Sequence, residues 1–190
     1  FSSKTIILSK PVPFSGLPGL ENMPSFSPDG KQIAFVWKEE QGNYDVYVKF
    51  IGTGEPLRLT QNPDNDLFPA FSPDGKSVAF IRSHLNNSEV FLIPALGGAE
   101  RRVCGLNALS SGLAFSPDGK TLAVIDSDPN KTNFGIFLVD IETGEKKRLT
   151  TPPESASDYE TSFSPDGKQL AFLRVFNRQV MELFVIPVSG

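Results

Sequence analysis

The sequence predicts an all-β fold, a β-propeller of four-stranded antiparallel blades, with four blades in this chain as a closed ring or as part of a larger propeller. The string Phe-Ser-Pro-Asp-Gly-Lys occurs four times, starting at Phe26, Phe71, Phe115 and Phe163, at intervals of 45, 44 and 48 residues. The 190 residues include 16 Gly and 16 Pro, which indicates many turns. The 3.6-residue apolar period of amphipathic helices is missing.

Each repeat is expected to begin with a short strand that ends at the motif phenylalanine. The Ser-Pro-Asp-Gly that follows favours a tight turn, because Pro sets φ to about −65° at the second turn position, Asp suits the third, and Gly accepts the left-handed conformation at the fourth. A strand, a turn and a second strand are therefore expected around every copy of the motif.

The second strand of each repeat carries four apolar residues in a row, which indicates that both of its faces are covered. Alanine occupies the same position in all four copies, so neighbouring sheets are expected to approach closely there. These strands are predicted at residues 33–36, 78–81, 122–125 and 170–173.

A third and a fourth strand complete the predicted repeat. The third has an aromatic residue at its centre in every copy, at residues 46–48, 90–92, 136–138 and 183–185. After a glycine-bearing turn, the fourth is more polar, as suits an outer strand with one face in water, at residues 57–59, 101–103 and 147–149. Four antiparallel strands in each repeat of this length are typical of a propeller blade.

The predicted blades span approximately residues 22–60, 66–104, 110–150 and 158–190, as one domain or fragment over residues 1–190. The last copy ends before its fourth strand. Residues 5–15, through either 6–8 or 12–14, are predicted to form a strand that completes an adjacent blade or the last one. The ring then closes with four blades, belongs to a larger propeller, or is enlarged by pairing of two copies as a homodimer.

Several kinds of chemistry are not expected. The net charge of −4 gives no reason to expect nucleic acid, and the longest apolar run has six residues, so no membrane insertion is expected. One His and one Cys cannot form a metal cluster or an intrachain disulfide, and no Gly-x-Ser-x-Gly string or phosphate-binding glycine loop is present. We expect no metal, no cofactor and no catalytic residue, with His84 in a solvated loop and Cys104 buried.

The loops opposite the motif turns vary most between copies, and a variable surface on a rigid scaffold is where binding is expected. Eleven residues after the motif phenylalanine, the copies carry Trp37, Arg82, Asp126 and Arg174. Three of these are charged, so the position is expected to be exposed and to bind a partner, since Trp and Arg are favoured at interfaces. Alternatively, Trp37 covers a local hydrophobic gap.

A second set of candidate partner-binding residues lies five residues before the motif phenylalanine: Glu21, Asp66, Ser110 and Asp158. If the first strands line the propeller axis, these residues surround the mouth of the channel, where three acids would attract a basic peptide or a cation. Alternatively, Asp66 and Asp158 hydrogen-bond to loop amides in Asx turns.

The repeats resemble the WD40-like repeats of the TolB β-propeller family. The resemblance rests on the motif, the Ala-Phe strand after it, the aromatic-centred strand, and the ending Gly-Glu-x-x-Arg-Leu-Thr at residues 54–60 and 144–150. It implies a bacterial protein of extracytoplasmic location, of the kind of a periplasmic partner of a lipoprotein, a sensor region of a regulator, or the propeller of a peptidase.

These observations favour a non-enzymatic module that binds a protein or peptide through the variable loops, of the TolB or regulator-sensor kind. The alternative is a substrate-gating propeller of a prolyl-oligopeptidase-like or tricorn-like peptidase, with the catalytic domain outside this chain.

Overall fold

The computed structural model describes residues 11–52, 54–108, 110–129, 131–177 and 180–189, and their regular structure consists of β-strands. Three sheets have four strands in chain order and the last has three. Blade 1 contains β1 (Leu20–Phe26), β2 (Gln32–Lys38), β3 (Asp45–Phe50) and β4 (Leu57–Arg58); blade 2 contains β5 (Asn65–Phe71), β6 (Ser77–Ser83), β7 (Ser88–Pro94) and β8 (Arg101–Leu106); blade 3 contains β9 (Leu113–Phe115), β10 (Thr121–Asp126), β11 (Gly135–Asp140) and β12 (Lys146–Arg148); blade 4 contains β13 (Ser157–Phe163), β14 (Gln169–Asn177) and β15 (Val180–Pro187). The predicted all-β propeller fold is confirmed.

The four motif turns have one geometry. In the first, the Ser27 hydroxyl donates to Asp29 Oδ1 at 2.7 Å, and the same oxygen accepts the Lys31 amide at 3.0 Å. Gly30 closes the turn with φ of 69°, where a side chain would be strained. Ser72–Asp74, Ser116–Asp118 and Ser164–Asp166 repeat this hydrogen bond at 2.6 Å, so each motif folds into the same rigid turn.

Three apolar layers lie between neighbouring blades. The alanine of the second strand faces the next blade, and Ala34, Ala79 and Ala123 are fully buried, as expected. Ala34 lies in the layer with Phe80 of blade 2, Ala79 in the layer with Leu122 of blade 3, and Ala123 in the layer with Phe172 of blade 4. In each layer, therefore, the small alanine side chain of one blade packs against larger apolar side chains of the next blade.

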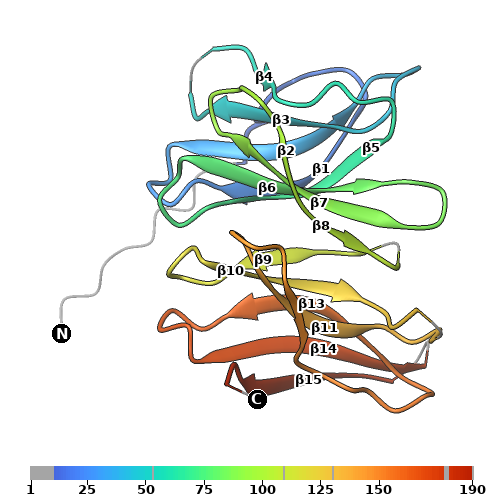
Figure 1. The fold of residues 1–190 in the computed structure, drawn as a ribbon. Coiled ribbons are helices and arrows are strands. Elements are labelled where there is room, and N and C mark those ends of the chain that lie inside the picture. The colour runs from blue at the N-terminus through green and yellow to red at the C-terminus, as the bar shows by residue number, and fades with distance from the viewer. Residues whose placement is uncertain (1–10, 53, 109, 130, 178–179, 190) are drawn as a thin grey trace.

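In the part of the chain that the structure describes, the blades follow one another without closing into a four-bladed ring. Contacts between the sheets join each blade to the next one along the chain, and Figure 1 shows blades 1 and 4 at opposite ends of the stack. Within the described residues, no helix is long and apolar enough to cross a membrane.

The strand predicted within residues 5–15 is not found where it can be assessed. Residues 5–10 lie outside the described residues, and residues 11–15 are not in a strand. Instead, the Phe14 ring meets Phe35 of blade 1 edge-on, with ring centroids 6.0 Å apart. The prediction for residues 12–14 is wrong, and the physical reason is that Pro11 and Pro13 lack the amides a ladder needs while Phe14 covers blade 1.

Candidate binding surfaces

The propeller has two faces that carry different turns and loops. The motif face carries the four Ser-Pro-Asp-Gly turns together with the turns that lead into the fourth strands. The loop face carries the hairpins between second and third strands and the connections between blades. The sequence predicted the binding residues on the loop face.

Trp37 lies on the loop face at the edge of blade 1, partly buried. Its indole nitrogen donates to the carbonyl oxygen of Pro18 at 3.0 Å, and its ring meets Tyr47 with centroids 5.0 Å apart. Both contacts match the alternative in which Trp37 covers local hydrophobic surface. Glu21, its cross-strand neighbour on β1, is exposed as expected.

The expectation that Arg82 is exposed is wrong, because only 5% of the residue is accessible. Its Nε and Nη2 donate to the two carboxylate oxygens of Asp66 at 2.8 and 2.9 Å, and Nη1 donates to Glu100 at 2.8 Å. The guanidinium also lies over the Phe91 ring, 4.6 Å from its centroid. Burial lowers the pKa of Arg82, but the hydrogen bonds that its guanidinium donates to the carboxylates of Asp66 and Glu100 outweigh burial and raise the pKa, so the side chain stays charged.

The same arrangement recurs in blade 4. Arg174 Nε donates to Asp158 Oδ1 at 2.6 Å and lies over Phe184, and its hydrogen bond to Asp158 raises the pKa of Arg174. Asp66 and Asp158 are fully buried. Their burial contradicts a position around an open channel mouth, and within the described residues their carboxylates accept from arginine and not from loop amides, so both interpretations of their position are wrong. The reason is that a cross-strand arginine compensates each buried carboxylate.

In blade 3, a lysine and not an arginine compensates the buried carboxylate. Asp126 is fully buried rather than exposed, and its Oδ2 accepts Lys146 Nζ at 2.6 Å. Its Oδ1 accepts the Asn107 amide at 2.7 Å. Ser110 is also buried, with its amide 3.4 Å from the Ser88 hydroxyl. Asp126 was expected to be exposed and Ser110 to lie at the mouth of the channel, but both are buried within the propeller.

His84 is not a freely solvated loop residue. Its Nδ1 lies 2.9 Å from Asp64 Oδ2 and its Nε2 lies 3.1 Å from Glu89 Oε2, and the hydrogen bond to Glu89, followed by that to Asp64, raises the pKa of His84. Arg102 in turn donates to Glu89. The described residues contain no group of three or more His, Cys, Asp or Glu placed to hold a metal ion.

Cys104 is buried in the layer between blades 2 and 3, as expected. Burial raises the pKa of its thiol to about 11, so the thiol stays protonated at neutral pH. A protonated thiol is neither a nucleophile nor a metal ligand.

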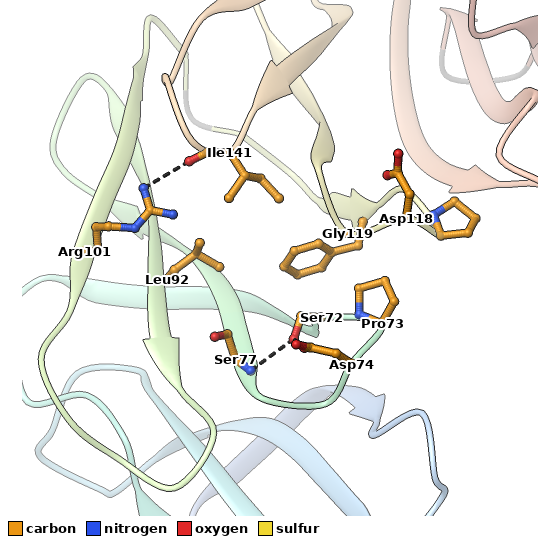
Figure 2. Close-up of a pocket in the computed structure, with 11 residues that line it drawn as sticks. Ser72, Pro73, Asp74, Ser77, Leu92, Arg101, Asp118, Gly119 and Ile141 are labelled. Atoms are coloured by element: carbon orange, nitrogen blue, oxygen red, sulfur yellow. Dashed lines mark hydrogen bonds between the residues drawn. The ribbon is translucent and has the colours of Figure 1, made fainter.

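The motif face carries a hollow that the sequence did not predict, here called the interblade groove. It lies between blades 2 and 3, has a volume of about 530 Å³, and is lined by Ser72, Pro73, Asp74, Ser77, Leu92, Arg101, Phe115, Pro117, Asp118, Gly119 and Ile141. Figure 2 shows Leu92 and Ile141 reaching into it, with two motif turns forming the opposite side. Its outer wall comes from turns of two different blades, which no single repeat reveals.

The rim of the interblade groove carries charges of both signs. Asp118 Oδ1 accepts the Ser116 hydroxyl and the Lys120 amide, and these hydrogen bonds, the hydroxyl's first, lower the pKa of Asp118. Its second oxygen has no hydrogen-bond or ion-pair partner within the described part of the chain. Across the groove, Arg101 Nη1 donates to the Ile141 carbonyl at 3.0 Å, as the dashed line in Figure 2 marks. An apolar floor thus lies between an anionic and a cationic rim.

Comparison with known proteins gives one family. The family described as TolB beta propeller domain matches residues 10–174. Among curated proteins, none matches the chain.

Solved structures with the same fold include TolB proteins and a peptidase. TolB from Acinetobacter baumannii is 28% identical with a TM-score of 0.73, and the match covers 93% of this chain and 42% of that one. For a putative TolB from Agrobacterium tumefaciens the values are 24%, 0.72, 92% and 60%. For a prolyl endopeptidase they are 15%, 0.66, 90% and 28%, a likeness of fold alone. The chain thus spans about half the length of these TolB structures.

Proposed function

Because this chain belongs to the TolB β-propeller domain family, we propose that it is a non-enzymatic module that holds a protein partner by a peptide segment in the interblade groove. The observation that carries the proposal is the groove itself, with its apolar floor and its oppositely charged rims. The groove is formed by strands and motif turns whose positions are fixed by the repeated hydrogen bonds, so it can bind a peptide without a conformational change.

The groove specifies the chemistry of the peptide. Leu92, Phe115 and Ile141 provide a site for one apolar side chain. A Lys or Arg next to that side chain would pair with Asp118, whose free carboxylate oxygen faces solvent. The unengaged N–H groups of Arg101 would donate to a peptide carbonyl. We therefore propose a segment in which an apolar residue is followed or preceded by a basic one.

Fluorescent hexapeptides test this proposal. Three peptides share a central phenylalanine and differ in the next residue, which is Lys, Gln or Glu, and binding is followed by fluorescence anisotropy. The Lys peptide is expected to bind most tightly and the Glu peptide least. An Asp118→Asn variant keeps the turn acceptor and loses the charge, so it is expected to lose the preference for Lys.

Asp29→Asn is the matched control, because Asp29 occupies the same turn in blade 1 and does not line the groove. It is expected to bind like the unchanged protein. Equal weakening by both variants, or no difference between the Lys and Glu peptides, would contradict the proposal. A Glu21→Gln variant tests the loop face in the same titration: if it alone weakens binding, the surface around Glu21 and Trp37 is the binding site.

A peptidase-gating role is the other candidate function. It is supported by the fold likeness to a prolyl endopeptidase, at 15% identity. The groove chemistry favours the binding module, because a gate would need no preference for one peptide charge.

A further inference from the structure

The interblade groove has a counterpart between blades 3 and 4, here called the second groove. It has a volume of about 410 Å³ and is lined by Ser116, Pro117, Asp118, Thr121, Phe163, Asp166, Gly167 and Val188. Each of these residues occupies, one repeat later, the position of a residue that lines the interblade groove. Phe163 and Val188, for example, are the counterparts of Phe115 and Ile141. The motif face therefore carries the same kind of hollow at two successive blade junctions.

The two grooves meet at the motif turn of blade 3, where Pro117 and Asp118 line both of them. The motif turns of neighbouring blades stand side by side. A Cβ on Gly119 would lie 3.6 Å from Pro73 Cδ, and one on Gly167 would lie 3.3 Å from Pro117 Cδ. A single ligand chain that crosses the blade 3 turn can therefore reach both grooves.

The aspartates at these two grooves differ in charge pairing from those of the first two turns. The second carboxylate oxygens of Asp29 and Asp74 each lie 3.8 Å from the ammonium group of the lysine in the same turn. Asp118 and Asp166 form no ion pair within the described part of the chain. Hydrogen bonds, that of the motif serine first, lower the pKa of both carboxyls, so both are anionic at neutral pH. Two unpaired anions beside apolar hollows favour a ligand that carries basic residues.

We propose that the two grooves bind one peptide in the polyproline II conformation, with apolar residues three positions apart, one in each groove, and with basic residues beside Asp118 and Asp166. The inference rests on the proposed function and names the class of peptide that it requires. Packed sheets lie about 10 Å apart. A polyproline II helix advances about 9 Å in one turn of three residues, so every third side chain points to the same side one blade further on.

A helical ligand fits the same spacing but not the same chemistry. Residues seven positions apart on an α-helix are also separated by about 10 Å. The carbonyl groups of a helix are engaged in its own hydrogen bonds, whereas those of a polyproline II segment are free to accept one from Arg101 at the rim of the interblade groove. The extended ligand is therefore favoured.

Fluorescence anisotropy with four labelled peptides tests the inference. Three of them have the same composition, with two Phe-Lys units in a chain of alanine and glutamine, and their phenylalanines lie three, four or seven positions apart. The fourth has one Phe-Lys unit. The spacing of three is expected to bind at least about tenfold more tightly than the single unit, because its second unit binds intramolecularly. The spacings of four and seven are expected to lack most of this gain.

Three serine variants at one repeat position show which groove is used. Ile141→Ser alters the interblade groove and is expected to weaken binding of all four peptides. Val188→Ser alters the second groove and is expected to abolish the tenfold advantage of the spacing of three. Ile51→Ser is the matched control, because Ile51 is the exposed counterpart in blade 1 and lines neither groove. It is expected to bind every peptide like the unchanged protein, and circular dichroism establishes that each variant is folded.

The outcomes separate this inference from the proposed function. Binding of the single-unit peptide with no preference among the spacings would overturn the inference and leave the proposed function in place. Tightest binding at a spacing of four or seven, or a tenfold advantage that persists in Val188→Ser, would also overturn it. Failure of all four peptides to bind would overturn the proposed function as well.

Discussion

Asp66 and Arg82 face each other across β5 and β6, and the guanidinium donates two hydrogen bonds to the two oxygens of a fully buried carboxylate. The pair joins the two predicted sets of binding residues into one structural unit. A charged residue five positions before the motif phenylalanine and another eleven positions after it are cross-strand neighbours. The opposite charges at these two positions thus pair across neighbouring strands and stabilise the sheet.

Replacing Arg82 with methionine is expected to lower the free energy of unfolding by about 3 to 5 kcal/mol, because removing one partner leaves a buried charge uncompensated. Urea unfolding followed by circular dichroism measures the loss. The double variant Asp66→Asn/Arg82→Met removes both charges and is expected to lose less. A double variant as unstable as the single one would show that packing, and not charge compensation, is at stake.

A second prediction concerns backbone conformation. Met23, Phe68 and Glu160 occupy the same position in three repeats with φ between 48° and 54°, next to a register shift in the first strand. Gly112 stands there in the third repeat. A side chain in this conformation costs about 1 to 2 kcal/mol. Glu160→Gly is therefore expected to raise the free energy of unfolding by up to about 1 kcal/mol, after the extra chain entropy of glycine is subtracted.

Glu160→Ala is the matched control, because it removes the exposed side chain and keeps the strained conformation. It is expected to give no gain in stability. Thermal unfolding distinguishes the two, and an equal gain from both would assign the effect to the glutamate charge.

Some features of the fold could be predicted from the sequence, and others depend on register and blade stacking that the sequence does not show. The four motif strings and the buried alanines predicted the turns and the interblade layers, because both depend on local spacing. The pairing of Asp66 with Arg82 depends on an extra residue in β5 at Phe68, which shifts the register between β5 and β6 by one residue. No residue type in the sequence indicates this shift. The interblade groove escaped prediction because Arg101 and Ile141 belong to different repeats and meet only when the blades stack.

A third prediction concerns pH. His84 lies between Asp64 and Glu89, with Arg102 on the far side of Glu89, and its pKa is raised by these hydrogen bonds. A histidine whose folded pKa exceeds its unfolded value stabilises the protein fully below the unfolded pKa. Stability is therefore expected to fall as pH rises from about 6.5 through the raised pKa of the folded state.

Chemical unfolding across this range measures the effect, and His84→Gln is expected to abolish this part of the pH dependence. The glutamine can still hydrogen-bond but does not titrate. The same fall in stability in both proteins would assign it to another group.

The last prediction compares two equivalent glycines, Gly54 and Gly144, which both precede a glutamate in the turn before the fourth strand. Their φ values are 76° and 73°, so alanine is strained at either position. A Cβ at Gly54 would meet open space, whereas one at Gly144 would overlap the carbonyl oxygen of Val103 in blade 2. Gly54→Ala is expected to cost about 1 to 2 kcal/mol from the backbone alone. Gly144→Ala is expected to cost about 3 kcal/mol or more, because blade 3 must also move away from blade 2. The hydrogen-exchange rates of the Val103 and Cys104 amides are expected to rise only in Gly144→Ala. An equal loss of unfolding free energy in the two variants would mean that blade 3 can shift against blade 2 at this contact without cost.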